Sequence, residues 1–292
     1  MEHLKLHKKR VKPFLKWAGG KRSLLPEILN RVPDESFELY VEPFLGGGAL
    51  FLELYQQGRI KKAILNDRNP ELINTWKMVR DQPAAIMDTV KRWAPTSESY
   101  YEVRALDEKG LSAVERAARV IWLNRHCFNG LYRLNKSGRF NVPFGKYKKV
   151  PTIDEANLYA VSEALQCATL YQLDFSGVLA MAGEGSLVYC DPPYWPMSTT
   201  ASFTAYDGQT FTTSDQHRLA EAFGQLEGRN AVGILSNSWT EETVALYESH
   251  GLFVDQVFCR RSINRDPTKR GPVPEVMVTN YDRATVQLKA RA

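Results

Sequence analysis

The sequence has few cysteines and no long apolar segment. Its 292 residues include four cysteines, at positions 127, 167, 190 and 259, and none of them forms a CxxC pair. This spacing argues against a zinc site or a disulfide framework and favours a reducing cytoplasm. No apolar run approaches the roughly 20 residues of a membrane helix, and the basic start MEHLKLHKKRVK lacks the apolar core and cleavage site of a signal peptide. We therefore expect a cytoplasmic protein that binds neither a membrane nor a metal.

Acidic residues are absent from one long basic stretch. Residues 125–149 include seven Lys and Arg and no Asp or Glu, although the net charge of the whole chain is only +5. Residues 1–31 carry nine Lys and Arg against two acids, and residues 260–270 carry five against one. Any one cluster is most simply a solvated basic face. Three clusters beside chemical motifs favour a polyanion such as nucleic acid.

Strand-like and helix-like segments alternate along most of the chain. Residues 38–58 are typical of a strand, a glycine turn and a helix, and residues 61–73 of a second strand followed by a helix. Further strands are predicted near 168–173, 186–190, 231–238, 253–259 and 275–281, with helices near 154–167, 214–227 and 240–250. This alternation predicts an α/β fold with a mainly parallel sheet and helices on both faces.

Residues 70–150 interrupt the alternation. Residues 70–125 have helical spacing of apolar positions, whereas 126–150 alternate apolar and polar residues about a turn at 135–138, as in a basic β-hairpin. We interpret 70–150 as an inserted subdomain within a discontinuous domain formed by 13–69 and 151–285. Residues 1–12 and 286–292 are predicted to be flexible tails.

A glycine turn and a spaced acid suggest a nucleoside ligand. Gly46–Gly48 lie between a predicted strand and helix, where glycines let a ligand approach the backbone, although a plain tight turn is the alternative. A dinucleotide GxGxxG motif fails because Phe51 occupies the third glycine position, and LKWAGGKR (15–22) does not fit a P-loop. Asp67 ends the next predicted strand, where an acid reaches ribose hydroxyls, although alone it could equally cap a helix.

The strand SLVYC (186–190) runs directly into Asp191, Pro192, Pro193 and Tyr194. The prolines fix the loop, while the Asp191 carboxylate and the Pro192 carbonyl provide two acceptors beside the flat ring of Tyr194. Two acceptors beside a flat surface suit the exocyclic amine of a base, although a stiff strand exit is the simpler alternative. Because ligands of such sheets bind beyond the carboxyl ends of the strands, we expect Gly46, Asp67 and Asp191 to converge on one crevice.

These motifs together resemble a known family. FLGGG (44–48) with DPPY (191–194) is similar to amino-methyltransferases that use S-adenosylmethionine. FLKWAGGKRSLLPEI (14–28), LNRHCFNGLYRLNKSGRFNVPFGKYKK (123–149) and the long stretch from 191 to 223 resemble the Dam family of DNA adenine-N6 methyltransferases. DPPY alone leaves cytosine-N4 and adenine-N6 open, and the long middle match favours adenine. The resemblance covers roughly residues 13–282 and implies a Rossmann-like methyltransferase domain, with 70–150 as its target-recognition subdomain.

The resemblance implies a role for specific residues. The cofactor S-adenosyl-L-methionine would contact Trp17, Lys21, Phe44, Gly46, Asp67 and Asp191. The target base would lie against the catalytic residues Asp191, Pro192 and Tyr194. Double-stranded DNA, with GATC as the target, would contact Lys16, Phe128, Asn129, Leu131, Arg133, Asn141, Pro143 and Tyr147. The sequence departs from the family pattern at Trp195, at His126–Cys127 and in the loop 264–274.

The implied reaction is direct methyl transfer by a monomer to a flipped-out adenine. Arg133 is the candidate to pair with guanine, with a phosphate contact as its alternative, and Leu131 and Pro143 are candidates for the thymine methyl group. The rival hypotheses are a cytosine-N4 or RNA amino-methyltransferase and a catalytically inactive DNA-binding module. A nicotinamide oxidoreductase is disfavoured by the missing third glycine. A chromosomal, phage or restriction–modification role is left open by the sequence.

Overall fold

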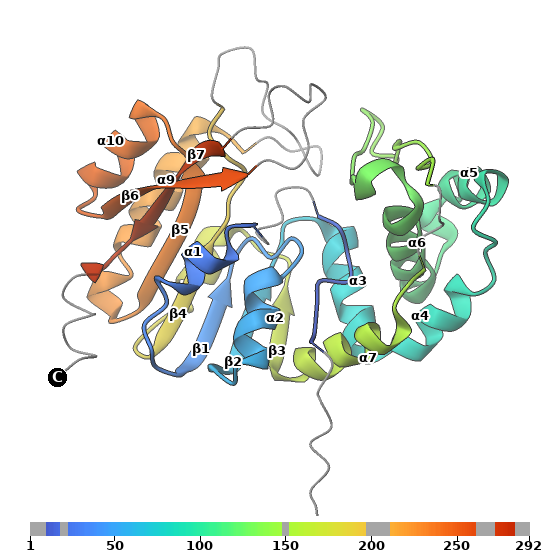
Figure 1. The fold of residues 1–292 in the computed structure, drawn as a ribbon, viewed down its shortest axis with the longest axis horizontal. Helices are drawn as coiled ribbons and strands as arrows, with labels where there is room; N and C mark the ends of the chain where they lie inside the picture. Colours follow the sequence, from blue (N-terminus) through green and yellow to red (C-terminus); the bar gives the residue numbers. More distant parts are fainter. Residues whose placement is uncertain (1–9, 18–22, 148–151, 197–210, 261–271, 284–292) are drawn as a thin grey trace, which may run out of the picture.

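The structure is a computed structural model that describes residues 10–17, 23–147, 152–196, 211–260 and 272–283. The predicted cofactor residue Lys21 and most of the loop 264–274 lie outside these residues. The described residues form one seven-stranded sheet with the strand order β3-β2-β1-β4-β5-β7-β6 (Figure 1). The strands are β1 (Phe37–Glu42), β2 (Ile60–Asn66), β3 (Ala168–Tyr171), β4 (Ser186–Cys190), β5 (Val232–Ser238), β6 (Phe253–Arg260) and β7 (Pro272–Thr279).

Strands β1 to β5 pair in parallel, and β7 runs antiparallel to both of its neighbours, β5 and β6. The strand order reverses between β1 and β4. Strands β2 and β3 follow on one side of β1, and strands β4 and β5 follow on its other side. This is the doubly wound, Rossmann-like arrangement that the alternating sequence pattern predicts. The predicted α/β fold class is therefore confirmed.

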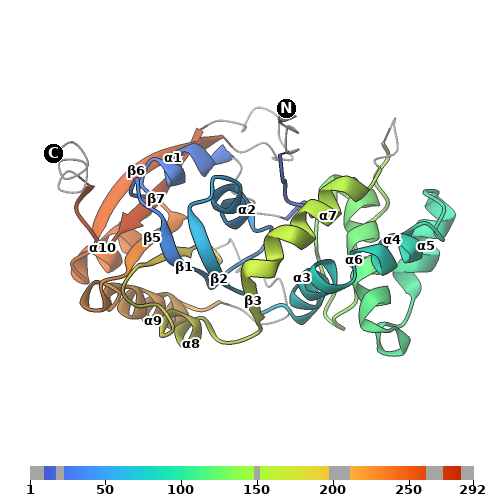
Figure 2. The ribbon, with the colours of Figure 1, turned by 90° about the horizontal axis from the view of Figure 1, so that it is seen from below.

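Helices cover both faces of the sheet. Figure 2 shows α1, α2 and α7 on one side of the strands and α8, α9 and α10 on the other. The helices described are α1 (Leu25–Leu29), α2 (Ala49–Gln56), α3 (Pro70–Asp81), α4 (Pro83–Val90), α5 (Ser97–Ala105), α6 (Ala113–His126), α7 (Glu155–Ala164), α8 (Phe175–Leu179), α9 (Thr213–Gly224) and α10 (Glu241–Ser249). No helix among the described residues is both long enough and apolar enough to span a membrane.

The strand β4 shows how the two faces are built. Val188 and Cys190 belong to the apolar cluster that packs under α8, α9 and α10, whereas Leu187 and Tyr189 belong to the cluster on the other face. Successive side chains of a strand point to opposite faces, so a strand covered on both sides must be apolar throughout. The apolar run before Asp191 is therefore explained by burial alone, and the polar residues begin where the strand leaves the core.

Helices α3 to α6 lie beside the β3 edge of the sheet (Figure 1), and α6 packs on α3, α4 and α5. The predicted β-hairpin after α6 is reduced to two isolated antiparallel bridges, Cys127 to Phe144 and Leu134 to Phe140. Its turn is as predicted, but the Asn135 side chain accepts the backbone N–H groups of Ser137 and Arg139. Pro143 has no N–H to donate, so a continuous ladder cannot form there. The division into two domains stays a prediction.

Candidate active site

The glycine turn after β1 is shaped by two tryptophans. Gly46 and Gly48 have φ of 47° and 61°, values that side-chain-bearing residues rarely adopt. A Cβ on Gly46 would lie 2.9 Å from Cδ1 of Trp17, and a Cβ on Gly48 would lie 2.8 Å from Cη2 of Trp76. The Trp76 indole N–H also donates to the Gly46 carbonyl at 3.1 Å. Backbone conformation and packing thus both require glycine, and Trp17 lies directly against the turn.

Asp67 lies beside this turn, as the sequence spacing predicts. Its Oδ2 accepts the Gly46 N–H at 2.9 Å, and its Oδ1 accepts the Asn69 N–H at 3.0 Å. Asn69, not Asp67, is the N-cap of α3. The Asp67 carboxylate therefore connects the ends of β1 and β2. The helix cap that the sequence left open for Asp67 is formed by Asn69.

The loops after the first three strands are joined by one buried amide. The Asn66 Nδ2 donates to the Pro43 carbonyl at 2.9 Å and the Leu173 carbonyl at 3.2 Å, and its Oδ1 accepts the Leu173 N–H at 2.8 Å. These bonds hold the segments after β1, β2 and β3 at the same edge of the sheet. No local sequence pattern identified Asn66 in advance, because its partners lie 23 and 107 residues away.

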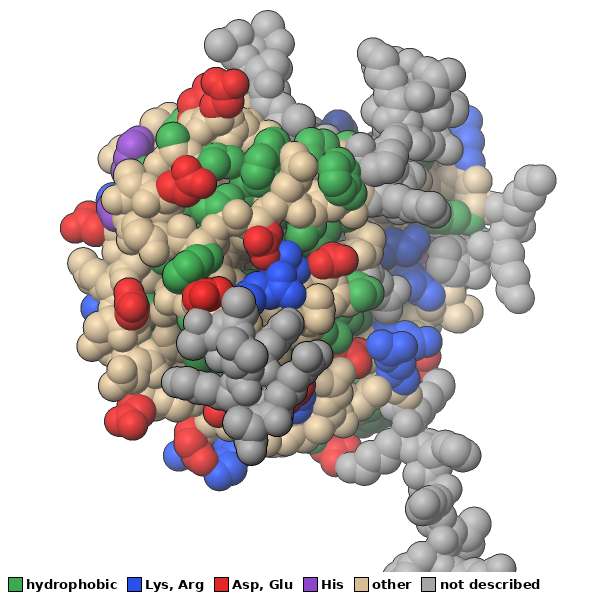
Figure 3. Space-filling model, turned by 60° about the vertical axis from the view of Figure 1, so that its left-hand side comes forward, with side chains coloured by type: hydrophobic (Ala, Val, Ile, Leu, Met, Phe, Trp, Pro, Cys, Tyr) green, Lys and Arg blue, Asp and Glu red, His purple; other side chains and the backbone are tan. Residues whose placement is uncertain are grey.

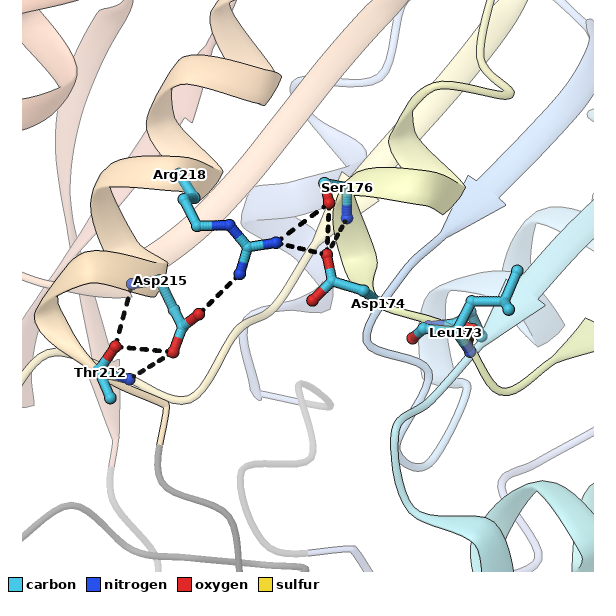
Figure 4. Close-up of polar contacts among 7 residues, drawn as sticks. Leu173, Asp174, Ser176, Thr212, Asp215 and Arg218 are labelled. Carbon is cyan, nitrogen blue, oxygen red and sulfur yellow. Dashed lines mark hydrogen bonds and ion pairs between the residues drawn. The ribbon is translucent and has the colours of Figure 1, made fainter.

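A further acid, Asp174, follows β3 at this edge. Its Oδ1 accepts the Ser176 N–H at 3.0 Å, which caps α8, and an Arg218 Nη2–H at 2.7 Å. Figure 4 shows the Arg218 guanidinium between the carboxylates of Asp174 and Asp215. Partial burial alone would raise the pKa of Asp174, but the Ser176 bonds and the Arg218 charge lower it below its usual range. Asp174 is thus a fixed anion that local sequence patterns did not indicate.

An aromatic group borders the same edge. The Phe44 ring lies 5.6 Å from the ring of Phe175 and 5.8 Å from the ring of Phe211, measured between centroids. The Arg218 guanidinium carbon lies 4.9 Å from the centroid of Phe175. Phe44 therefore takes part in an apolar wall that continues into the Asp174 region.

The carboxyl groups at the ends of β1, β2 and β4 influence one another. Glu42 is 3% exposed, and Tyr40 donates its hydroxyl hydrogen to Glu42 at 2.9 Å. Burial, together with the negative charges of Asp191 and Asp67, raises the pKa of Glu42 well above its usual range. Glu42 therefore holds its proton to a higher pH than an exposed glutamate, and the nearby carboxyl groups of Asp67 and Asp191 give this edge of the sheet the negative character that attracts a cation.

The loop after β4 presents Asp191 and Tyr194 with separate supports. The Ser236 hydroxyl, at the end of β5, donates to the Asp191 Oδ1 at 3.2 Å. The Tyr194 hydroxyl donates to the Glu275 Oε2 of β7 at 2.7 Å. Pro192, between the two, is buried. The structure thus brings the predicted catalytic residues to the edge of the sheet where Glu42 and Asp67 lie.

Buried polar side chains hold the backbone of this loop. Gln216 of α9 donates to the Pro193 carbonyl at 2.9 Å, and Asn237 accepts the Trp195 N–H at 2.8 Å. Ser238 donates to the Trp195 carbonyl at 2.6 Å, and Asn237 donates to Gln216 at 3.0 Å. The rigidity of the loop therefore depends on these residues as well as on its prolines. Their only sequence signal is a polar SNS at the end of an apolar strand.

The segment 10–17 lies between the glycine turn and the predicted DNA-recognition residues. Asn124 of α6 accepts the Lys16 N–H and donates to the Lys16 carbonyl, both at 2.8 Å, and donates to the Gly130 carbonyl at 2.9 Å. The Lys16 ammonium lies 5.5 Å from the Tyr147 ring centroid. The rings of Trp17 and Tyr132 lie 5.0 Å apart, centroid to centroid. Lys16 and Trp17 thus contact the recognition segment and the glycine turn respectively.

The other predicted DNA-binding residues lie on the outer part of the recognition segment. Phe128, Asn129, Arg133 and Pro143 are exposed, while Leu131, Asn141 and Tyr147 are partly buried. The Arg133 Nε–H donates to the Asn141 Oδ1 at 2.7 Å, so these two candidates lie side by side. The face brought forward in Figure 3 instead carries scattered Asp and Glu side chains, which would repel a polyanion.

Two of the departures from the family pattern, His126 and Cys127, belong to the core. His126 is buried and its Nδ1 lies 2.8 Å from the Trp122 carbonyl, while Cys127 is fully buried. Trp195 packs against the α9 side of the sheet. No group of three or more His, Cys, Asp or Glu residues in the described part of the chain is arranged to hold a metal ion.

Comparison with known proteins gives consistent matches. The family model described as "D12 class N6 adenine-specific DNA methyltransferase" matches residues 17–258. A type II methyltransferase of Lactococcus lactis subsp. cremoris is 38% identical over 289 residues, which cover 96% of this chain and 99% of that one. A DNA adenine methylase of Vibrio cholerae serotype O1 is 39% identical over 274 residues, covering 92% and 96%. The DNA adenine methylase of Escherichia coli K12 is 38% identical over 273 residues, covering 92% and 95%.

Proposed function

The chain belongs to the family of D12 class N6 adenine-specific DNA methyltransferases, and from this premise we propose that it methylates adenine within GATC in double-stranded DNA, with S-adenosylmethionine as the donor and a flipped-out base as the acceptor. The observation that carries the proposal is the placement of Asp191 and Tyr194 at the exit of β4, beside the carboxyl groups at the ends of β1 and β2. The target sequence follows from the resemblance of residues 123–149 to the Dam family.

This edge of the sheet has the chemistry that S-adenosylmethionine requires. The donor is a cation at its sulfonium and ammonium groups, which suits the region around the carboxyl groups of Asp67 and Asp191. The Gly46 turn, Trp17 and Phe44 would hold the cofactor, and the fixed anion Asp174 would accept a hydrogen bond from its adenine amine. When bound, S-adenosylmethionine supplies an electrophilic methyl group.

The chain's own residues supply position and charge. Adenine N6 is a weak nucleophile because its lone pair is delocalised into the ring. The Asp191 carboxylate and the Pro192 carbonyl would accept hydrogen bonds from the two N6 hydrogens and turn the lone pair towards the methyl group. As N6 bonds to the methyl carbon, the bond from that carbon to sulfur would break with its electron pair left on sulfur, and N6 would then lose one proton to water. Orienting two reactants in this way is worth up to ~7–11 kcal/mol in the best cases. The Asp191 charge also stabilises the positive charge that develops on N6.

The target amine cannot be reached while adenine is stacked in the duplex, so the base must leave the helix at a cost of a few kcal/mol. Stacking of the extruded base on the Tyr194 ring would return ~1–3 kcal/mol. The hydrogen bond from Tyr194 to Glu275 supports this role, because it anchors the far end of the tyrosine side chain.

We assign the recognition of bases to the recognition segment, which is the part of the chain between residues 123 and 149. The exposed Arg133 would donate to O6 and N7 of a guanine in the major groove, a contact worth ~1–3 kcal/mol of discrimination. Leu131 and Pro143 would contact the thymine methyl group. Lys16, which is held by Asn124, would make a basic contact beside them. The remaining Lys and Arg of the segment would contact phosphates and make affinity salt-dependent.

The test is made on DNA from cells that express this protein. That DNA should resist enzymes that cut only unmethylated GATC and yield to enzymes that cut only methylated GATC. Nucleoside analysis should show N6-methyladenine and not N4-methylcytosine. Expression of the Asp191→Ala variant is the control, and it should leave the DNA unmethylated although the variant folds and binds DNA. N6-methyladenine outside GATC would refute the target sequence, and near-normal turnover by Asp191→Ala would refute the mechanism.

A further inference from the structure

Glu275 is a buried acid on β7 that faces the target-base loop. It pairs with Ser238 of β5 and Val257 of β6 and is 6% exposed. Burying a carboxylate is costly unless it is hydrogen-bonded. Among the described residues, the Tyr194 hydroxyl, at 2.7 Å, is the only group that donates a hydrogen bond to the Glu275 side chain. The buried carboxylate of Glu275 is thus directed at the hydroxyl group of Tyr194.

The direction of this hydrogen bond is well defined. Burial, with the negative charges of Asp191 and Glu275, raises the pKa of the Tyr194 phenol well above its usual range. Tyr194 therefore stays protonated and donates, and Glu275 accepts. A hydrogen bond with a charged acceptor is about twice as strong as one between neutral groups.

The other supports of the loop act mainly on its backbone and on Asp191. Gln216, Asn237 and Ser238 bind the backbone of Pro193 and Trp195, on either side of Tyr194. Ser236 binds the Asp191 carboxylate and also hydrogen-bonds to the Tyr194 side chain. Glu275 binds the end of the Tyr194 side chain at 2.7 Å and anchors the tyrosine hydroxyl to β7, which restricts the swing of the ring about the Cα–Cβ bond.

We infer that Glu275 is a positioning residue that holds the Tyr194 ring as the stacking surface for the target adenine beside Asp191. The inference deepens the proposed function and rests on it, because it takes Tyr194 to be the surface on which the adenine stacks. Glu275 itself touches neither base nor donor in this scheme, and acts through the tyrosine hydroxyl.

The test is a double-mutant cycle on methyl transfer to plasmid DNA, with kcat and KM measured separately by incorporation of tritiated methyl groups. Glu275→Ala and Tyr194→Phe each remove one partner, and each should lower kcat/KM by about 10-fold, the loss expected for a hydrogen bond to a charged group. The double variant should be no slower than the slower single variant, because both changes remove the same contact. Glu275→Gln keeps an acceptor oxygen and should stay within about threefold of wild type.

Asn280 provides the matched control for a purely structural effect. It follows β7, is 7% exposed, and binds the backbone of Gly233 and Ala231 at the far end of β5. Asn280→Ala should lower the melting temperature without lowering kcat/KM, and every rate is compared well below the lowest melting temperature. If Glu275→Ala does not fold, Tyr194→Phe and Glu275→Gln still measure the contact from either side.

Three results would overturn the inference: wild-type turnover by Glu275→Ala, equal impairment of Glu275→Gln and Glu275→Ala, or full multiplication of the single effects in the double variant. Failure of the proposed function would be seen separately, as a wild-type enzyme that produces no N6-methyladenine. In that case the inference falls with the function, whereas an active wild type with an unaffected Glu275→Ala refutes the inference alone.

Discussion

Two asparagine side chains hold the segment 10–17 against the rest of the protein in the same way. Asn157 of α7 accepts the Lys12 N–H and donates to the Lys12 carbonyl, both at 2.9 Å. Asn124 of α6 forms the same pair of bonds with Lys16, and it also donates to the Gly130 carbonyl. Both asparagines are buried, at 8% and 2% exposure respectively. The pair therefore allows an effect on stability to be separated from an effect on DNA binding.

We expect Asn124→Ala to destabilise the protein by about 2–4 kcal/mol. The change removes three hydrogen bonds of roughly 1 kcal/mol net each, and the buried carbonyl of Gly130 loses its partner, whereas water can solvate the exposed Lys16. Asn157→Ala removes two such bonds, so about 1–3 kcal/mol is expected. Thermal unfolding should then show a lower melting temperature for both variants, by ~2–4 °C per kcal/mol for a chain of this size.

Only Asn124→Ala should weaken DNA binding, because only Asn124 seats Lys16 beside the recognition segment. A contact worth ~1.4 kcal/mol corresponds to a tenfold change in Kd. The measurement is fluorescence anisotropy with a GATC duplex at one fixed salt concentration, far below either melting temperature. The reasoning is refuted if the two variants raise Kd equally, or if Asn124→Ala lowers the melting temperature and leaves Kd unchanged.

Three further changes test separate parts of the site. The pKa of Glu42 in the folded protein lies above its usual value of 4.5, so at a pH just above 4.5 the folded state binds more protons than the unfolded state. The free energy of unfolding therefore falls as the pH rises above that value, by up to ~1.4 kcal/mol per pH unit. Glu42→Gln removes this dependence, so the melting temperature of the variant should rise relative to that of wild type as the pH is increased above about 5. Gly46→Ala should weaken donor binding in calorimetry by about 10-fold or more, because a Cβ there meets Trp17 and φ is positive. Arg133→Ala should lose discrimination at one guanine of the target in competition assays, and uniform weakening on all sequences would instead assign Arg133 to a phosphate.

The sequence was informative where one local pattern dictates one local structure. The strands predicted at the start of 38–58, in 61–73 with its end at Asp67, and at 186–190 correspond to β1, β2 and β4, and β4 is apolar until it leaves the core because it is covered on both faces. The glycine turn and Asp67 were predicted to meet, and they do. The position of β7 between β5 and β6 could not be predicted, since nothing in a single strand specifies its neighbours.

The β-hairpin is less regular than its alternating sequence pattern predicts, because side chains compete for the backbone hydrogen bonds. Apolar and polar residues do alternate between 126 and 147, but Asn135 captures backbone donors at the turn and Pro143 has none to offer. Some backbone groups do pair across the turn, such as the Asn141 N–H with the Arg133 carbonyl at 3.1 Å, but others are bound elsewhere. Tyr100 and Arg104 of α5, for example, both donate to the Val142 carbonyl. The segment is thus held by contacts with neighbouring helices, which cannot be predicted from the segment's own sequence.

The residues that could not be predicted share a physical role. Asn66, Gln216, Asn237 and Glu275 are buried polar side chains, and each binds at least one partner that lies between 21 and 107 residues away in sequence. A hydrogen bond of this kind adds only about 1 kcal/mol when it is made, but a buried group that loses its partner costs about 1–3 kcal/mol. Such residues therefore add little to the free energy of unfolding, but they raise the free energy of every other arrangement of the loops that they join. That is the property needed to keep an acid, a carbonyl and a ring at fixed positions around one amine. Substitutions that remove a member of this set should consequently reduce turnover by more than their effect on the free energy of unfolding would suggest.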